Sequence, residues 1–90
     1  MSEKRRDAIP DRAQVRSQVF ARDGYRCQAA SLFLDVRCFG NLTVHHLTKA
    51  SQGGTYTPDN LVTLCARHND LIEERPTIAT ALGLVRRPHG

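Results

Sequence analysis

The segment spanning residues 45–69 constrains this chain more than any other part. It holds three of the four histidines, His45, His46 and His68, together with Asn60. Imidazole and amide side chains contribute little to a hydrophobic core, so packing alone does not explain why they gather here. Histidine is a frequent metal ligand and a general base suited to neutral pH. The segment therefore predicts a metal-dependent catalytic site.

Short apolar runs in this region predict the order strand, loop, strand, helix. Residues 42–46 follow the turn at Gly40-Asn41 and are expected to form a strand with Leu42 and Val44 facing inward. A polar loop that turns at Gly53-Gly54 should follow. The remaining expected elements are a loop over 48–60, a strand over 61–64, a helix over 66–75 that ends at Pro76, and a short helical turn over 77–82.

A further helix is predicted near the N-terminus, from a cap at Asp11 to about Arg22. Asp23-Gly24 provides the stop signal. The apolar side chains of this helix share one face at helical spacing: Val15, Val19 and Phe20.

Ninety residues with 40% apolar and 6% aromatic side chains bury only a modest core. Domains of this size often depend on a metal or on disulfides. Residues 1–9 are charged and are expected to form a disordered arm before a single domain over 10–90. The start of the chain lacks the apolar stretch of a secretory signal, and no apolar run approaches the ~20 residues of a membrane span. We therefore expect a cytoplasmic protein.

The cysteines favour a zinc site over a disulfide framework. Three is an odd number, which fits a reducing compartment. Cys65-x-x-His68 has finger-like spacing at a predicted strand-to-helix junction, and Cys27 and Cys38 are further thiols upstream. Together they would complete a closed tetrahedral Cys₃His site. The alternative is that the cysteines are free core residues.

The ordered motif resembles the HNH endonucleases, metal-dependent enzymes that cut DNA with a ββα-metal fold. The resemblance covers about residues 19–75, with its motif core at 42–75, and rests on His46, Asn60 and Asn69 in that order. The family usually has a second histidine where this chain has Asn69. The fold class implied is α+β: a small ββα-metal domain with an N-terminal helix and a zinc-stabilised knuckle.

The resemblance also implies roles for the motif residues. His46 would activate the attacking water, while His45 and Asn69 would hold a divalent ion, Mg²⁺, Mn²⁺ or Ni²⁺. Asn60 would brace the loop and help position His46. Since adjacent strand residues face opposite ways, both histidines can serve one site only if the strand bends at its end.

Two further points concern the metal ligands. A competing register uses His68 as the third motif residue, which rotates that ligand by about 100° around the helix. Asn69 is preferred because His68 suits the zinc site.

Many HNH domains carry zinc on two Cys-x-x-Cys pairs. Here the first pair would be stretched to Cys27 and Cys38, and His68 would replace one cysteine of the second.

Charge favours a double-stranded DNA partner only in combination with this motif. The net charge is +4, and eleven of the thirteen basic residues are arginine, whose planar fork suits phosphate. Judged singly, each of these side chains is a solvated surface residue. The candidate phosphate contacts are Arg12, Arg16, Lys49 and Arg67, with Arg86 and Arg87 in the tail.

The sequence therefore predicts an endonuclease that nicks double-stranded DNA with low sequence specificity, as a monomer or weak dimer. Its compact form is similar to that of phage members, which implies work beside a phage packaging or other DNA-processing protein in the host cytoplasm. One alternative is a non-catalytic, zinc-stabilised DNA-binding or adaptor module. Another is a structural phage or host interaction protein without DNA affinity.

Overall fold

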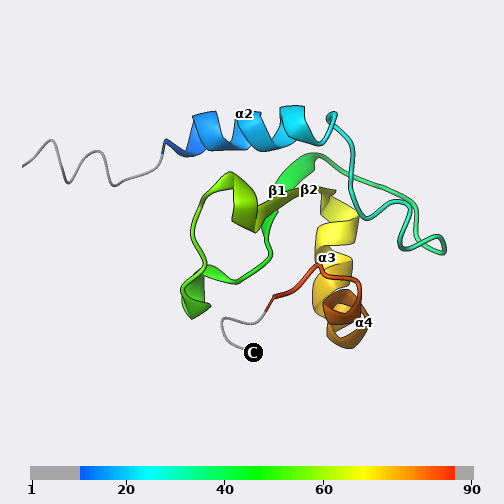
Figure 1. Cartoon of the computed structure of the whole chain (residues 1–90). Helices are drawn as coiled ribbons and strands as arrows, with labels where there is room; N and C mark the ends of the chain where they lie inside the picture. Colours follow the sequence, from blue (N-terminus) through cyan, green and yellow to red (C-terminus); the bar gives the residue numbers. More distant parts are fainter. Residues whose placement is uncertain (1–10, 87–90) are drawn as a thin grey trace, which may run out of the picture.

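The computed structural model describes residues 11–86, and their elements follow the predicted order. The predicted arm over 1–9 and Arg87 lie outside the described residues. Figure 1 shows a two-stranded antiparallel hairpin between one helix on one side and two short helices on the other. The α+β class is confirmed. The elements are α2 (Arg12–Arg22), β1 (Leu42–His46), η1 (Ala50–Gln52), η2 (Pro58–Asn60), β2 (Leu61–Cys65), α3 (Ala66–Glu74) and α4 (Pro76–Ala81).

The N-terminal helix is confirmed together with both of its end signals. The Asp11 side chain accepts a hydrogen bond from the backbone N–H of Gln14 at 3.2 Å, which satisfies one of the free donors of the first turn. The helix stops at Asp23, and Gly24 then adopts a φ of +67°. Val19, on the predicted apolar face, is fully buried.

A polar clamp fixes the last turn of α2 to the hairpin. The Arg22 guanidinium pairs with the Asp23 carboxylate at 2.9 Å and donates to the carbonyl oxygens of Pro58 and Leu61, each at 2.8 Å. Asp23 in turn accepts the backbone N–H of Thr63 in β2 at 2.9 Å. Burial works against ionisation of Asp23, but the hydrogen bonds from Arg22 and Thr63 lower its pKa overall. The orientation of α2 is therefore set by β2.

The hairpin pairs Leu42 with Cys65 at its open end and His46 with Leu61 beside the loop. β2 is buried at four of its five positions, whereas every residue of β1 is half-buried. Leu42 and Val44 are thus no more buried than their neighbours, and the expected inward alternation is absent. The reason is that both α2 and α3 contact β1, so neither of its faces is fully open.

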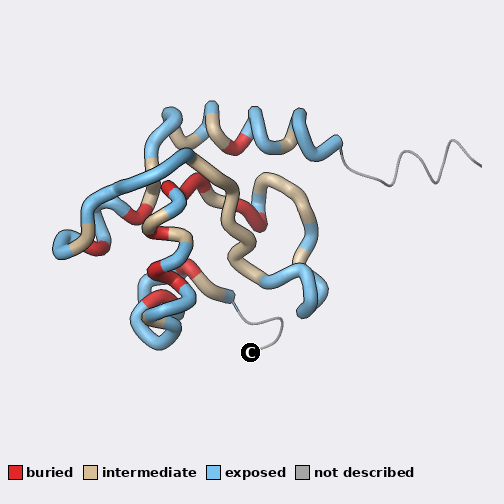
Figure 2. Tube along the Cα trace, turned by 180° about the vertical axis from the view of Figure 1, so that it is seen from behind, coloured by how far each residue is buried: buried red, intermediate tan, exposed pale blue. Residues whose placement is uncertain are grey.

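The core lies between β2, α3 and α4, and Figure 2 shows the buried positions gathered there. α4 begins at Pro76, where a missing N–H costs nothing because the first turn has no partner for it. The chain then returns to the core through Leu84, which is 5% exposed. Among the described helices, none is long and apolar enough to cross a membrane. The buried cluster consists of Ala29, Phe33, Leu64, Leu71, Ile72, Ala79 and Leu84.

We expect Asp23→Ala to lower the free energy of unfolding by about 1–3 kcal/mol, because it leaves the Thr63 N–H without its acceptor and removes the carboxylate partner of Arg22. Urea denaturation followed by circular dichroism measures the change. Asp70→Ala makes the same alteration at an exposed carboxylate of α3 and should change stability little. Equal stability of the two variants would contradict the clamp.

Candidate functional site

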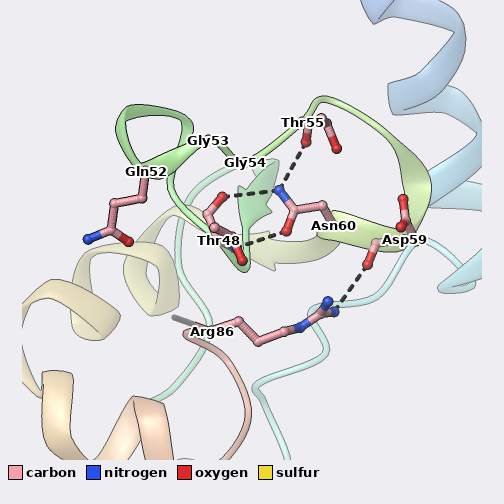
Figure 3. A pocket seen from close by; sticks show the side chains of 8 residues that line it. All are labelled: Thr48, Gln52, Gly53, Gly54, Thr55, Asp59, Asn60 and Arg86. Atoms are coloured by element: carbon pink, nitrogen blue, oxygen red, sulfur yellow. Dashed lines mark hydrogen bonds between the residues drawn. The ribbon is translucent and has the colours of Figure 1, made fainter. Parts of the chain in front are cut away.

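The loop between the strands is built around the side chain of Asn60, which is 6% exposed. Its Oδ1 accepts the Thr48 N–H at 2.9 Å, and its Nδ2 donates to the carbonyl oxygens of Thr48 at 3.0 Å and Thr55 at 2.9 Å (Figure 3). One amide therefore ties the two sides of the loop together, just beyond the end of β1. That its purpose is to position His46 stays a prediction.

The two glycines of the loop are both required by its geometry, as the predicted turn implied. Gly53 closes η1 with a φ of +89°, a left-handed conformation that other residues adopt with strain. A Cβ on Gly54 would collide with the Thr48 carbonyl and lie 2.9 Å from Asn60 Nδ2. The Asn60 network therefore leaves no room for a side chain at position 54.

One cavity of about 380 Å³ brings together the predicted base and the two predicted ligands of the catalytic ion. It lies between the end of β1 and α3. The structure thus places His45 and His46 beside the same space, although they are adjacent in a strand. Its lining residues are Val44, His45, His46, Lys49, Ala50, Asn69 and Glu73.

His45 is oriented by the C-terminal segment. Its Nε2 lies 2.7 Å from the carbonyl oxygen of Leu84. Because a carbonyl only accepts, Nε2 carries a proton and donates, so Nδ1 is the ring nitrogen that faces other partners. Metal-binding histidines commonly use the second ring nitrogen in this way to fix the orientation of the ring. His45 is therefore oriented as metal-binding histidines commonly are.

His46 is half-buried at the end of β1, and its ring lies against that of Tyr56 with centroids 5.6 Å apart. Burial lowers the pKa of His46, and the nearby charges of His45 and Arg12 lower it further. An imidazole with a lowered pKa is neutral at pH 7, the form in which it can accept a proton from water.

A separate cluster of three thiols and one imidazole lies at the start of α3. The ligand atoms of Cys27, Cys38, Cys65 and His68 are all within 4.8 Å of one another. His68 Nδ1 is 3.4 Å, 3.5 Å and 3.1 Å from the three sulfur atoms in that order. Tetrahedral zinc, with bonds of about 2.3 Å to sulfur and 2.0 Å to nitrogen, holds such atoms about 3.5 Å apart. The predicted Cys₃His cluster is confirmed, and its spacing fits zinc.

The surroundings of the cluster favour a bound cation. His68 is fully buried, and its Nε2 lies 2.9 Å from the Val36 carbonyl, so Nδ1 is left free to face the sulfurs. Burial and the neighbouring thiols raise the pKa of Cys38 to about 12. Burial also disfavours the Cys65 thiolate, but backbone hydrogen bonds from His68 and Phe39 lower its pKa to about 6. Three thiolates this close together need a cation to be stable.

His68 and Asn69, the two candidates for the third motif residue, lie at different sites. His68 lies in the thiol cluster, while Asn69 lines the cavity beside His45 and His46. Their side chains leave α3 in different directions because neighbouring residues are about 100° apart around a helix. This placement favours Asn69 as the third motif residue.

The family comparison agrees with this geometry. A family model described as HNH endonuclease matches residues 32–75. Residues 32–75 form an HNH endonuclease domain. Members of this family are phosphodiester hydrolases, and membership implies nuclease activity on DNA. No significant match was found among curated proteins or among solved structures.

The matched range of the HNH domain contains β1, the loop, β2 and α3, and therefore every residue that lines the cavity. It leaves out α2 and Cys27, although α2 is clamped to β2 and Cys27 completes the thiol cluster. The folded unit is thus larger than the matched segment.

Sequence reasoning missed two residues that lie beside the proposed motif residues. Glu73 lies one helical turn after Asn69 and lines the same cavity, so the i, i+4 spacing on α3 could have indicated it. Tyr56 contacts His46 only because the loop folds back, and no local pattern predicts that contact.

The candidate phosphate contacts of the HNH domain differ in their surroundings. Lys49 lines the cavity beside His45 and His46, whereas Arg67 pairs with Glu74 at 2.9 Å and does not line it. Arg12 lies over the Tyr56 ring at 4.4 Å. Arg16 lies over Phe20 at 5.1 Å, and Arg86 donates to the Asp59 carbonyl at 3.1 Å (Figure 3). DNA contact by each of these residues stays a prediction.

We expect the protein, purified without chelators, to contain about one equivalent of zinc by elemental analysis, because four ligands complete one closed site. Cys65→Ser should lose most of this zinc and unfold at a lower temperature, since metal binding is coupled to folding. Ser31→Ala, at an exposed position of the same knuckle, is the control and should keep its zinc. A full equivalent retained by Cys65→Ser would count against the cluster as the zinc site.

Proposed function

We propose that this HNH domain is a metal-dependent endonuclease that nicks double-stranded DNA with low sequence specificity. The observation that carries the proposal is the single cavity lined by His45, His46 and Asn69, with Lys49 at its edge. This arrangement supplies a neutral base, cation ligands and a positive charge for phosphate within one small space.

His46 is proposed as the general base. Its imidazole accepts a proton from water as the water oxygen attacks phosphorus, and the bond from phosphorus to the 3′ oxygen breaks. The lowered pKa keeps this imidazole available as a base at neutral pH. Asn60 fixes the loop that leaves β1 directly after His46, which limits movement of the strand end.

His45 Nδ1 and Asn69 Oδ1 are proposed to hold the catalytic cation. A divalent ion bound there would stabilise the negative charge that develops on the phosphate and leaving oxygens. One imidazole and one amide oxygen, with the Glu73 carboxylate on the same cavity, form an oxygen-rich set that favours Mg²⁺ or Mn²⁺. Ni²⁺ remains the third candidate, through His45.

The Cys₃His cluster is proposed as a structural zinc site. Four protein ligands leave no open coordination position for water or substrate, as in other structural zinc sites. The ligands come from the segment before β1, the end of β2 and the start of α3, so a single ion would join three parts of the chain.

One cavity with this combination of side chains, among residues 11–86, supports cutting of one strand in each encounter, by a monomer or weak dimer. The compact domain is similar to phage members of the family, and we propose work beside a phage packaging or other DNA-processing protein in the host cytoplasm. Asn69 in place of histidine favours one second candidate, a zinc-stabilised DNA-binding or adaptor module that does not cleave.

We expect the protein to relax supercoiled plasmid by nicking with Mg²⁺, Mn²⁺ or Ni²⁺, and to stop in EDTA. His46→Ala should slow nicking by at least about 100-fold, the usual contribution of a general base. Asn69→His, which restores the common family residue, should lower the metal concentration needed for half-maximal rate because imidazole binds transition metals more strongly. Gel electrophoresis of the plasmid forms measures each rate.

The adaptor candidate predicts a different result in the same assay. If folded wild-type protein binds DNA but produces no relaxed plasmid with any of the three cations, the endonuclease proposal fails. Binding that is equal for wild type and His46→Ala, and weaker at higher salt, would then identify the binding module.

A further inference from the structure

Tyr56 lies between the proposed general base and a basic residue of α2. Its ring centroid is 5.6 Å from that of His46, with the two planes inclined by 59°. The guanidinium carbon of Arg12 lies 4.4 Å from the same Tyr56 centroid. Tilted aromatic pairs and a cation over a ring face are both attractive arrangements. The three side chains therefore form a stack, here called the Arg12–Tyr56–His46 stack.

Three separate parts of the fold meet in this stack. His46 ends β1, Tyr56 belongs to the loop just before η2, and Arg12 is the first residue of α2. The helix passes over this loop (Figure 1), and α2 contacts η2. Because the Arg22–Asp23 clamp fixes the other end of α2 to β2 and to Pro58, the position of Arg12 relative to Tyr56 is determined by the fold.

The loop does not depend on the Tyr56 ring for its own closure. Asn60 ties Thr48 to Thr55 through three hydrogen bonds. On the other side, the hydroxyl groups of Thr55 and Thr57 lie 2.8 Å apart, and Thr57 donates to Asp59 at 2.6 Å. These bonds use backbone groups and other side chains. Removal of the half-buried Tyr56 ring should therefore leave the loop closed.

We propose that Tyr56 is a positioning residue for His46 and that Arg12 holds Tyr56 in place. The inference rests on the proposed nuclease function, because it concerns the orientation of the base. A ring packed against His46 restricts rotation of the imidazole, and a misplaced catalytic group can reduce a rate by about 100-fold. α2, which lies outside the matched residues 32–75, thereby becomes part of the active site.

The two uses of Arg12 are compatible. Its guanidinium carbon lies over the Tyr56 ring, and the N–H groups of a planar guanidinium can still meet a phosphate oxygen. Lysine offers the charge without the plane, so Arg12→Lys separates stacking from charge alone.

The test compares Tyr56→Leu, which removes the ring, with Tyr56→Phe, which keeps it. Single-turnover nicking at saturating DNA gives the cleavage rate, and titration of a labelled duplex without divalent metal gives the Kd. We expect Tyr56→Leu to slow cleavage by about 10- to 100-fold with a Kd within about twofold of wild type. Tyr56→Phe should recover most of the lost rate.

A spectroscopic measurement follows the ring contact itself. In a proton–carbon spectrum of the histidine rings, the His46 signals should shift in Tyr56→Leu, because they lose the ring current of the tyrosine, and should stay near their wild-type positions in Tyr56→Phe. Tyr25→Leu makes the same change at a tyrosine that is 63% exposed and should leave the His46 signals in place. If Tyr56→Leu does not fold, Arg12→Gln at the exposed end of the stack replaces it, with Arg12→Lys as its partner. Slower cleavage at saturating DNA is expected for Arg12→Gln, and the rate alone is compared, because Arg12 is also a candidate phosphate contact.

The outcomes distinguish failure of the positioning role of Tyr56 from failure of the nuclease proposal. Active wild type with an equally fast Tyr56→Leu variant overturns the positioning role alone. A Tyr56→Leu variant that loses DNA affinity in proportion to its rate makes Tyr56 a DNA contact and also overturns it. Wild type that never cleaves DNA overturns the nuclease proposal, and the positioning role falls with it. Unshifted His46 signals in Tyr56→Leu would show that the contact does not orient the ring.

Discussion

Three cysteine thiolates repel one another strongly at close range, and the fold around α3 depends on how that repulsion is balanced. Three thiols and one imidazole converge from segments far apart in sequence. Cys27 and Cys38 precede the hairpin, Cys65 ends β2, and His68 lies in the first turn of α3. A cation is the natural counterpart of such a set. The apolar cluster is small, and much of it packs around the same helix, α3. Metal binding and core packing therefore act on the same elements, and both fix where α3 leaves the sheet.

The position of α3 in turn decides where the chemistry can take place. Adjacent residues at the start of this helix face different sites: His68 is buried with the thiols, and Asn69 reaches the cavity at the end of β1. Asn60 holds the loop that follows His46 through its bonds to Thr48, and Lys49 and Ala50 of that loop line the same cavity. A structural site and a proposed catalytic site thus share a single helical turn as their common support.

Much of this arrangement follows from local sequence signals. Asp11, Asp23-Gly24 and Pro76 mark helix ends through local chemistry: a side-chain cap, a left-handed glycine and a missing N–H. The apolar runs predict the order of the hairpin and α3 correctly. What local signals do not contain is the contact made across the fold. The half-burial of Leu42 and Val44 depends on helices on both sides of β1, and Arg22 contacts η2 and β2 as a clamp that no spacing indicates. Glu73 lines the cavity and Tyr56 contacts His46 only because the loop and α3 come together in the fold.

The hydrogen bond between His45 and Leu84 connects the proposed metal ligand to the last described turn of the chain. The backbone N–H of Arg86 also reaches back, to the carbonyl of Leu47. On the proposed assignment, movement of residues 84–86 would change the orientation of His45 and leave the four ligands of the zinc cluster in place. Local opening of this last turn would thus weaken the hold on the catalytic cation before it affected the zinc cluster.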